Sequence, residues 1–160
     1  MPNFILFFAG LFVLAFIALL WLRQTLMHHL DQLKHHQDIL KKDLEKVRDL
    51  TPFLLEGARE GEGVTDAWNF LVQKRAAFLN PSSLAQDFEF EKDVQHFIAN
   101  STLKNVMYLE AKKDLTELFK LIQEQKEKMS VLIQKFNHIR KQFPYSLASG
   151  IFGIREVNPL

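Results

Sequence analysis

The feature that most constrains this chain is an uncharged apolar run of nineteen residues from Phe4 to Leu22. At about 1.5 Å per residue, a helix of this length crosses most of a hydrocarbon core about 30 Å thick. No basic residue precedes the run, and bulky side chains close it instead of a small-x-small cleavage site. These flanks favour a retained anchor over a cleaved signal peptide. The sequence therefore predicts a single transmembrane helix over residues 4–22, after a short external N-terminus formed by residues 1–3.

The basic residues after this run predict the orientation of the chain. Four follow it within twenty residues, namely Arg23, Lys34, Lys41 and Lys42. Cytoplasmic flanks of membrane helices carry an excess of Lys and Arg, so the bulk of the chain is expected in the cytoplasm, with a single pass through the cell (inner) membrane. Trp21 and Arg23 are then expected at the lipid boundary, where aromatic and basic residues gather.

The composition narrows the fold and the class of partner. The chain has 20 Lys and Arg against 19 Asp and Glu, so no strong field recruits nucleic acid. It has no cysteine, which excludes disulfides, thiolate metal ligands and a cysteine nucleophile. Strand formers never alternate with polar residues over a long stretch, whereas Leu, Lys, Glu, Gln and Ala dominate. We expect an all-α protein.

Two long stretches carry apolar residues at alternating spacings of three and four, which is typical of packed helices. The predicted helices cover Arg23 to Arg59 and Lys104 to Phe143, and Pro144 ends the second. Pro52 predicts a kink near residues 49–51. The apolar positions of the first are Leu26, Leu30, Leu33, Leu40, Leu44 and Val47, interrupted by Gln37; those of the second are Tyr108, Ala111, Leu115, Leu118, Ile122, Met129, Leu132, Phe136, Ile139 and Phe143, interrupted by Gln125.

Two shorter helices are expected between the long ones. Three glycines over residues 57–63 mark the first turn, Thr65 or Asp66 is a candidate cap, and residues 80–83 separate the two short helices. Their apolar positions are Trp68, Leu71, Val72 and Leu79, then Phe90, Val94, Phe97 and Ile98. With short connections, the four helices form an elongated up-down antiparallel bundle over residues 23–143. The C-terminal tail, residues 144–160, is then expected near the membrane.

The membrane-proximal part of such a bundle contains only the two long helices, because the short ones cover the distal half. We call this part the stalk. A two-helix pair leaves apolar surface for a further partner, so we predict self-association or binding of another membrane protein there. The candidate interaction surface consists of Leu26, Leu30 and Leu33 on one helix and Leu132, Phe136 and Ile139 on the other.

Two stretches resemble the LemA family over nearly the whole length of the chain. The segment LEKVRDLTPFL, residues 44–54, is similar to the family's D-L-I-P-N-L signature after the opening helix. The segment FNHIRKQFPYSLASGIFGI, residues 136–154, is similar to its closing pattern of Y-N, then F-P, then a Leu/Gly-rich end. The matching positions are Asp49, Leu50, Pro52 and Leu54, then Asn137, Phe143, Pro144, Leu147, Gly150, Phe152 and Gly153. The resemblance implies a helical bundle, an external N-terminus and a cytoplasmic domain, but no particular reaction.

The chain departs from the family at several polar positions and resembles a divergent member. Phe53 replaces the usual Asn, and the last helix has Phe119, Lys126 and Met129-Ser130 where Glu, Arg and Tyr-Asn are usual.

No motif in the sequence predicts catalytic, cofactor-binding or metal-binding residues, and we expect no enzyme activity and no small-molecule substrate. His28, His29, His35 and His36 form two pairs seven residues apart, roughly 10 Å along a helix and too far for one ion. They are expected on a solvated face, with a pH-responsive charge or metal bridging between protomers as alternatives. Asp93 and His96 have the spacing of a di-iron ligand pair, but only one such pair occurs.

The sequence leaves the role of the C-terminal region open between packing on the bundle and entering the lipid interface. The candidate lipid-proximal residues are Trp21, Arg23, Lys135, Arg140, Lys141 and Phe152. The favoured function is a membrane-anchored helical scaffold or adaptor that mediates protein–protein interaction or self-association. The alternatives are a membrane-organising protein whose basic, aromatic C-terminus contacts lipid, and a metal-dependent enzyme.

Overall fold

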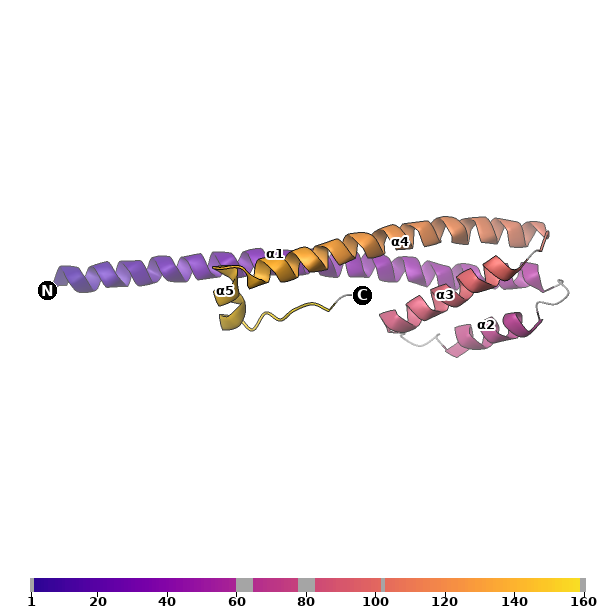
Figure 1. Cartoon of the computed structure of the whole chain (residues 1–160), viewed down its shortest axis with the longest axis horizontal. Coiled ribbons are helices and arrows are strands. Elements are labelled where there is room, and N and C mark those ends of the chain that lie inside the picture. Colours follow the sequence, from indigo (N-terminus) through magenta and orange to yellow (C-terminus); the bar gives the residue numbers. More distant parts are fainter. Residues whose placement is uncertain (1, 60–64, 78–82, 102, 159–160) are drawn as a thin grey trace. The chain divides into compact units, whose positions relative to one another are not determined.

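A computed structural model describes residues 2–59, 65–77, 83–101 and 103–158 of the chain. These residues form five helices and no strand, so the predicted all-α class is confirmed (Figure 1). The helices are α1 (Pro2–Ala58), α2 (Thr65–Ala77), α3 (Leu84–Asn100), α4 (Val106–Lys141) and α5 (Tyr145–Ile151). The described chain divides into two compact units, one of residues 1–37 and 127–160 and one of residues 38–126.

Helix α1 is long and apolar enough, by length and composition, to cross a membrane near the N-terminus. Only 6% of its most apolar 18-residue window is buried inside the chain. The side chains from Leu6 to Leu20 are exposed, apart from half-buried Leu19. Among the side chains described from Leu6 onward, Leu22 is the first that is buried, and the helix continues without a break into residues that pack.

Pro52 does not interrupt α1, and the helix continues to Ala58 (Figure 1). A proline has no N–H, so the carbonyl of Arg48 loses its partner within the helix. The side chain of Arg75 on α2 supplies a replacement, because its Nε donates to the Arg48 carbonyl over 3.3 Å. The Thr51 hydroxyl donates to the Val47 carbonyl over 2.6 Å in the same turn. These contacts explain why the proline is tolerated inside the helix.

The second unit contains α2, α3 and the parts of α1 and α4 that lie within residues 38–126. Its buried apolar residues include all four predicted for the third helix, Phe90, Val94, Phe97 and Ile98. Helix α3 begins at a capping box, in which the Ser83 hydroxyl accepts from the Gln86 N–H and the Gln86 side chain accepts from the Ser83 N–H. Trp68 on α2 donates its indole N–H to the Leu55 carbonyl over 2.9 Å, near the end of α1. Leu79 lies outside the described residues.

Gly57 is not the turn residue expected from the sequence. It is buried inside α1, where a Cβ would lie 2.5 Å from the backbone nitrogen of Tyr108. Its missing side chain therefore allows α1 and the first turn of α4 to approach backbone to backbone. Gly61 and Gly63, the other two glycines of the expected turn, lie outside the described residues.

We expect Gly57→Ala to lower the free energy of unfolding by about 1–3 kcal/mol, because the added methyl group meets the rigid backbone of α4. Urea unfolding of the full chain in detergent, monitored by the helical signal in far-UV circular dichroism, measures the change in the free energy of unfolding. Gly150→Ala is the control, since no atom lies within 4 Å of the added Cβ at that position. Equal stability of the two variants would contradict the close approach.

The long C-terminal helix ends near the predicted position, but the chain then forms an unexpected helix. Helix α4 stops at Lys141, and Phe143 is 79% exposed, so its assignment to the apolar seam was wrong. Gln37 is likewise exposed, whereas Gln125 is half-buried. Helix α5 follows Pro144 and ends at Ile151. Gly153, two residues further on, has a φ of 64°, which suits glycine. The Ile154 N–H donates to the Ser149 carbonyl over 2.9 Å, which completes a Schellman motif.

Candidate functional site

The candidate interaction surface of the stalk is largely closed by the chain itself. Leu26, Leu33 and Phe136 are buried, whereas Leu30, Leu132 and Ile139 are half-buried. Ile133, which the sequence pattern did not select, is buried in place of its neighbour Leu132. These side chains mainly form the core of the stalk, and Leu30, Leu132 and Ile139 retain partial exposure.

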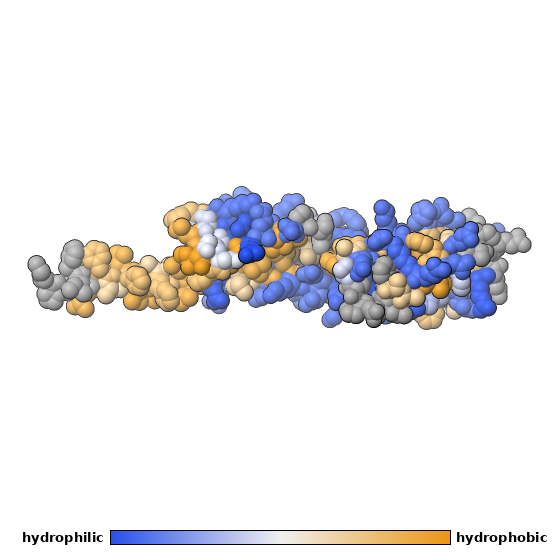
Figure 2. Space-filling view, turned by 90° about the horizontal axis from the view of Figure 1, so that it is seen from below, coloured by the Kyte–Doolittle hydropathy of each residue, from blue (hydrophilic) through white to orange (hydrophobic). Residues whose placement is uncertain are grey.

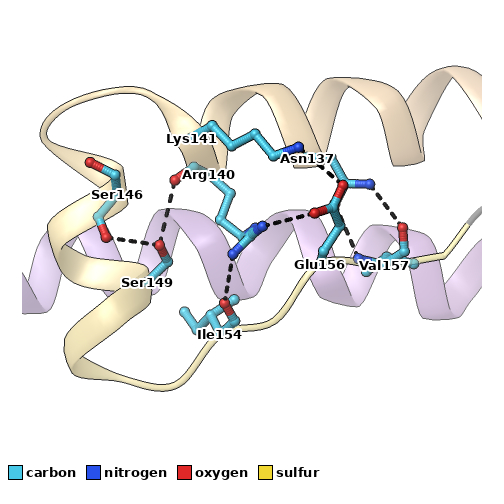
Figure 3. Close-up of polar contacts among 8 residues, drawn as sticks. All are labelled: Asn137, Arg140, Lys141, Ser146, Ser149, Ile154, Glu156 and Val157. Atoms are coloured by element: carbon cyan, nitrogen blue, oxygen red, sulfur yellow. Dashed lines mark hydrogen bonds and ion pairs between the residues drawn. The ribbon is translucent and has the colours of Figure 1, made fainter.

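The C-terminal segment doubles back along α4 and is held by polar contacts (Figure 3). The Asn137 side chain makes two hydrogen bonds with the backbone of Val157, donating to its carbonyl over 2.8 Å and accepting from its N–H over 3.1 Å. A side-chain amide can satisfy both backbone groups of one residue in this way, as an adjacent strand would. Asn137 thus fixes the register between the tail and α4.

Two basic residues of α4 hold the same segment through Glu156 (Figure 3). The Arg140 guanidinium lies 3.3 Å and the Lys141 ammonium 3.1 Å from the carboxylate. Arg140 also donates to the Ile154 carbonyl over 3.4 Å, and the Ser149 hydroxyl lies 3.4 Å from the Arg140 carbonyl and 3.0 Å from that of Ser146. Part of the basic charge expected to face lipid is therefore engaged within the chain.

We expect Asn137→Ala to release the end of the tail, because two backbone groups of Val157 lose their partner. Hydrogen exchange of the full chain should then be faster at Val157, by roughly tenfold for the loss of about 1–1.5 kcal/mol. Gln134→Ala is the matched control on an exposed position of the same helix. Unchanged exchange at Val157 would show that the amide does not hold the tail.

The other candidate lipid-proximal residues lie near the start of the stalk. The Arg23 guanidinium lies 5.5 Å from the centroid of the Phe152 ring, within the range of a cation–π contact. Trp21 is 62% exposed, and Lys135 is also exposed. The first charged residue after the apolar run therefore contacts the residue that follows α5.

Helix α5 has a buried and an exposed side. Ala148 and Ser149 are buried, whereas Leu147 and Ile151 are 54% and 62% exposed. Leu147 and Ile151 are four residues apart and lie on one side of the helix. We call exposed Phe143, Leu147 and Ile151 the C-terminal apolar patch. This helix was not predicted from the sequence, although Pro144 before its first residue and Gly153 after its last are common helix-boundary signals.

The second unit contains buried charges that the sequence analysis also missed. The Arg48 guanidinium is paired with the carboxylate of Asp87, whose side chain is 2% exposed. The Lys126 ammonium lies 2.6 Å from Glu91 and 4.3 Å from the centroid of the Phe88 ring. These pairs join α1 to α3 and α4 to α3. Because each buried carboxylate is paired with a cation, these charges are explained by the packing of the unit and do not indicate a catalytic site.

Lys74 and Tyr108 make this unit sensitive to alkaline pH. Burial alone would lower the pKa of Lys74, but hydrogen bonds and charges from Asp93 and Glu89 outweigh it and raise that pKa above 10.5. Burial raises the pKa of the Tyr108 hydroxyl above 10.0, and the neighbouring Ser101 offsets part of the rise. In both cases the folded state retains its proton to higher pH than the unfolded state, so stability is lost as pH rises above about 10.

We expect Tyr108→Phe to make the loss of stability above pH 10 shallower by up to about 1.4 kcal/mol per pH unit, since one proton fewer is released on unfolding. Urea unfolding at a series of pH values from 8 to 11.5 measures the slope. Tyr145→Phe keeps the tyrosine number equal and serves as the control. If the free energy of unfolding falls with pH at the same slope in both variants, the role of Tyr108 is contradicted.

The candidate metal ligands do not come together. Among the described residues, no group of three or more His, Cys, Asp or Glu side chains could hold a metal ion. Asp93 is engaged by Lys74, whereas His96 lies beside Asn100, whose side chain is 3.0 Å from the ring Nε2. The rings of His28 and His29 are 6.1 Å apart, and those of His35 and His36 are 6.0 Å apart.

An open groove of about 720 Å³ lies between α3 and α4 in the second unit. Its lining is mixed, with Ile98 and Phe119 beside Lys112, Lys120 and Glu124.

Comparison of the chain with protein-family models, with curated proteins and with solved structures finds no match.

Proposed function

We propose that the chain is a membrane-anchored helical scaffold or adaptor, which residues 4–22 fix to the bilayer and whose remaining helices bind another protein or a second copy. The observation that carries the proposal is the apolar run of α1, which is helical yet almost uncovered by the rest of the chain. Each exposed apolar side chain costs free energy in water, at roughly 25 cal/mol per Å². A lipid bilayer removes that cost.

The finer architecture belongs to the same proposal. We infer an up-down antiparallel bundle of LemA type, with its bulk in the cytoplasm beside the cell (inner) membrane. The contacts of Arg75 with Arg48 and of Trp68 with Leu55 support an antiparallel arrangement of α1 and α2. The later residue of α2 contacts the earlier residue of α1, so the two helices run in opposite directions. Asn137 and Gly153, which match the closing pattern of that family, have the defined local roles described above.

A binding role is supported by how the second unit uses its polar residues. Its buried carboxylates at Asp87 and Glu91 are paired with cations, which suits a packed structural unit. Its groove between α3 and α4 is open and mixed in character, as protein-binding surfaces commonly are. Since the stalk core is closed, we propose that partners bind to exposed positions of this unit.

Photocrosslinking in membranes tests the proposal. A photoreactive amino acid replaces Thr116 or Leu121, which are exposed on α4, and mass spectrometry identifies the adducts. The matched controls are their fully buried neighbours Leu115 and Ile122. We expect adducts with a second protein or a second copy from the exposed probes and only intrachain products from the buried ones. Exposed probes that yield no interchain adduct would contradict a scaffold that binds through exposed positions of this unit.

A further inference from the structure

We propose that the C-terminal apolar patch, Phe143, Leu147 and Ile151, inserts into the interfacial layer of an anionic bilayer and forms a second membrane contact beside the transmembrane helix. The proposal rests on the proposed membrane anchoring of α1. All of the residues that carry it lie in the unit of residues 1–37 and 127–160.

The patch lies beside the end of the apolar run of α1. Arg23 is the first charged residue after the apolar run, and its guanidinium lies 5.5 Å from the Phe152 ring. Phe152 directly follows Ile151, the last residue of α5. Since the lipid boundary falls where the apolar run ends, α5 lies at the depth of the headgroups when α1 spans the bilayer.

Helix α5 has one buried side and one exposed apolar side. Ala148 and Ser149 are buried against the chain, and Ser149 contacts the carbonyl of Arg140. The opposite side exposes Leu147 and Ile151, and Phe143 before the helix is exposed even more. In the space-filling view, hydrophobic surface runs along the N-terminal part of α1 and continues to the region of α5 (Figure 2). The patch therefore extends the surface that the bilayer would cover.

The segment that contains the patch carries mostly positive charge. Four basic residues, Lys135, Arg140, Lys141 and Arg155, accompany one acid, Glu156, between residues 135 and 158. Glu156 is shared between Arg140 and Lys141, and Lys135 and Arg155 are exposed. Cationic side chains near the membrane surface are attracted to anionic headgroups by about 1 kcal/mol each. Exposed apolar residues flanked by Lys and Arg are typical of a segment that lies in the membrane interface.

A patch of this kind could also be covered by a second copy of the chain. The surrounding charge argues against this, because two copies would bring like-charged side chains together in a symmetric contact. An anionic lipid surface has no such penalty. The bilayer is therefore the occupant that the residues around α5 fit.

Site-directed spin labelling of the full chain tests the proposal, since the absence of cysteine allows single labels. Nitroxides are placed at Leu147 and Ile151, with Phe12 of the apolar run as the lipid reference and exposed Glu117 on α4 as the water reference. The protein is reconstituted in vesicles of phosphatidylcholine with phosphatidylglycerol. The accessibility to oxygen relative to a water-soluble nickel chelate reports the depth of each label.

We expect the oxygen-to-nickel accessibility ratio at Leu147 and Ile151 to be severalfold above that at Glu117 and below that at Phe12. Omitting phosphatidylglycerol should lower the ratio, and an equal ratio in both lipids would overturn the assignment to an anionic surface. If the ratio at Leu147 and Ile151 equals that at Glu117 while Phe12 keeps a high ratio, the second membrane contact is overturned and the transmembrane anchor is retained. A water-like Phe12 would overturn the anchor itself. Spin–spin broadening at residue 147 that disappears on dilution with unlabelled chain would assign the patch to a second copy and overturn the lipid contact.

Discussion

The variant Val13→Arg/Phe16→Arg is expected to leave the membrane fraction, while the wild-type chain stays in it after a carbonate wash. Both side chains are exposed in the middle of the apolar run, so the rest of the chain cannot shield the new charges. An arginine near the centre of a membrane helix costs about 2.5–3.5 kcal/mol, and two cost about 6 kcal/mol. By the usual conversion, this is a shift of about 10⁴ in the insertion equilibrium.

The control for this prediction is Leu109→Arg/Leu121→Arg, which adds the same charge at exposed apolar positions of α4 outside the run. This variant should remain in the membrane fraction. Retention of the Val13→Arg/Phe16→Arg chain after the wash would mean that the apolar run is not the anchor, and it would remove the basis of the proposed function.

The second large effect is expected at the buried ion pair of Arg48 and Asp87. Arg48→Leu leaves a carboxylate that is only 2% exposed without its cation, and we expect a loss of about 3–5 kcal/mol in the free energy of unfolding. The double variant Arg48→Leu/Asp87→Leu should recover most of this loss, because no buried charge then lacks compensation. Chemical unfolding of the full chain in detergent measures all three free energies.

A surface ion pair provides the comparison. Arg59 and Glu56 are 69% and 60% exposed in their side chains, so Arg59→Leu should cost less than about 1 kcal/mol. A cost for Arg48→Leu as small as that for Arg59→Leu would contradict the buried pair. A double variant as unstable as the single one would show instead that Asp87 contributes through other contacts.

Parts of this structure could be predicted because they depend on regular patterns along one helix. The exposed apolar run, the buried face of Phe90, Val94 and Phe97, and the end of α4 before Pro144 follow from hydrophobicity, periodicity and the missing N–H of proline. These signals are local, so no knowledge of neighbouring helices is needed to use them.

The features that were missed depend on contacts between distant residues. Gly57 resembles a turn residue in the sequence, and only the position of Tyr108, fifty-one residues further on, makes it a packing residue. Asp87 and Glu91 resemble surface carboxylates until their partners on α1 and α4 are known. The core of the stalk differs from the predicted one for a related reason, since the phase of α4 buries Ile133 more deeply than Leu132.

The unbroken course of α1 from the apolar run into the stalk has a mechanical consequence. A helix without a hinge cannot tilt in one half only, so residues 4–22 and 23–37 must lean together. Membrane helices adapt to bilayers of different thickness partly by tilting. If α1 spans the bilayer, a thinner membrane would incline the stalk and raise or lower α5 against the headgroups. A change in bilayer thickness would then reach α5 as a change in the tilt of the stalk.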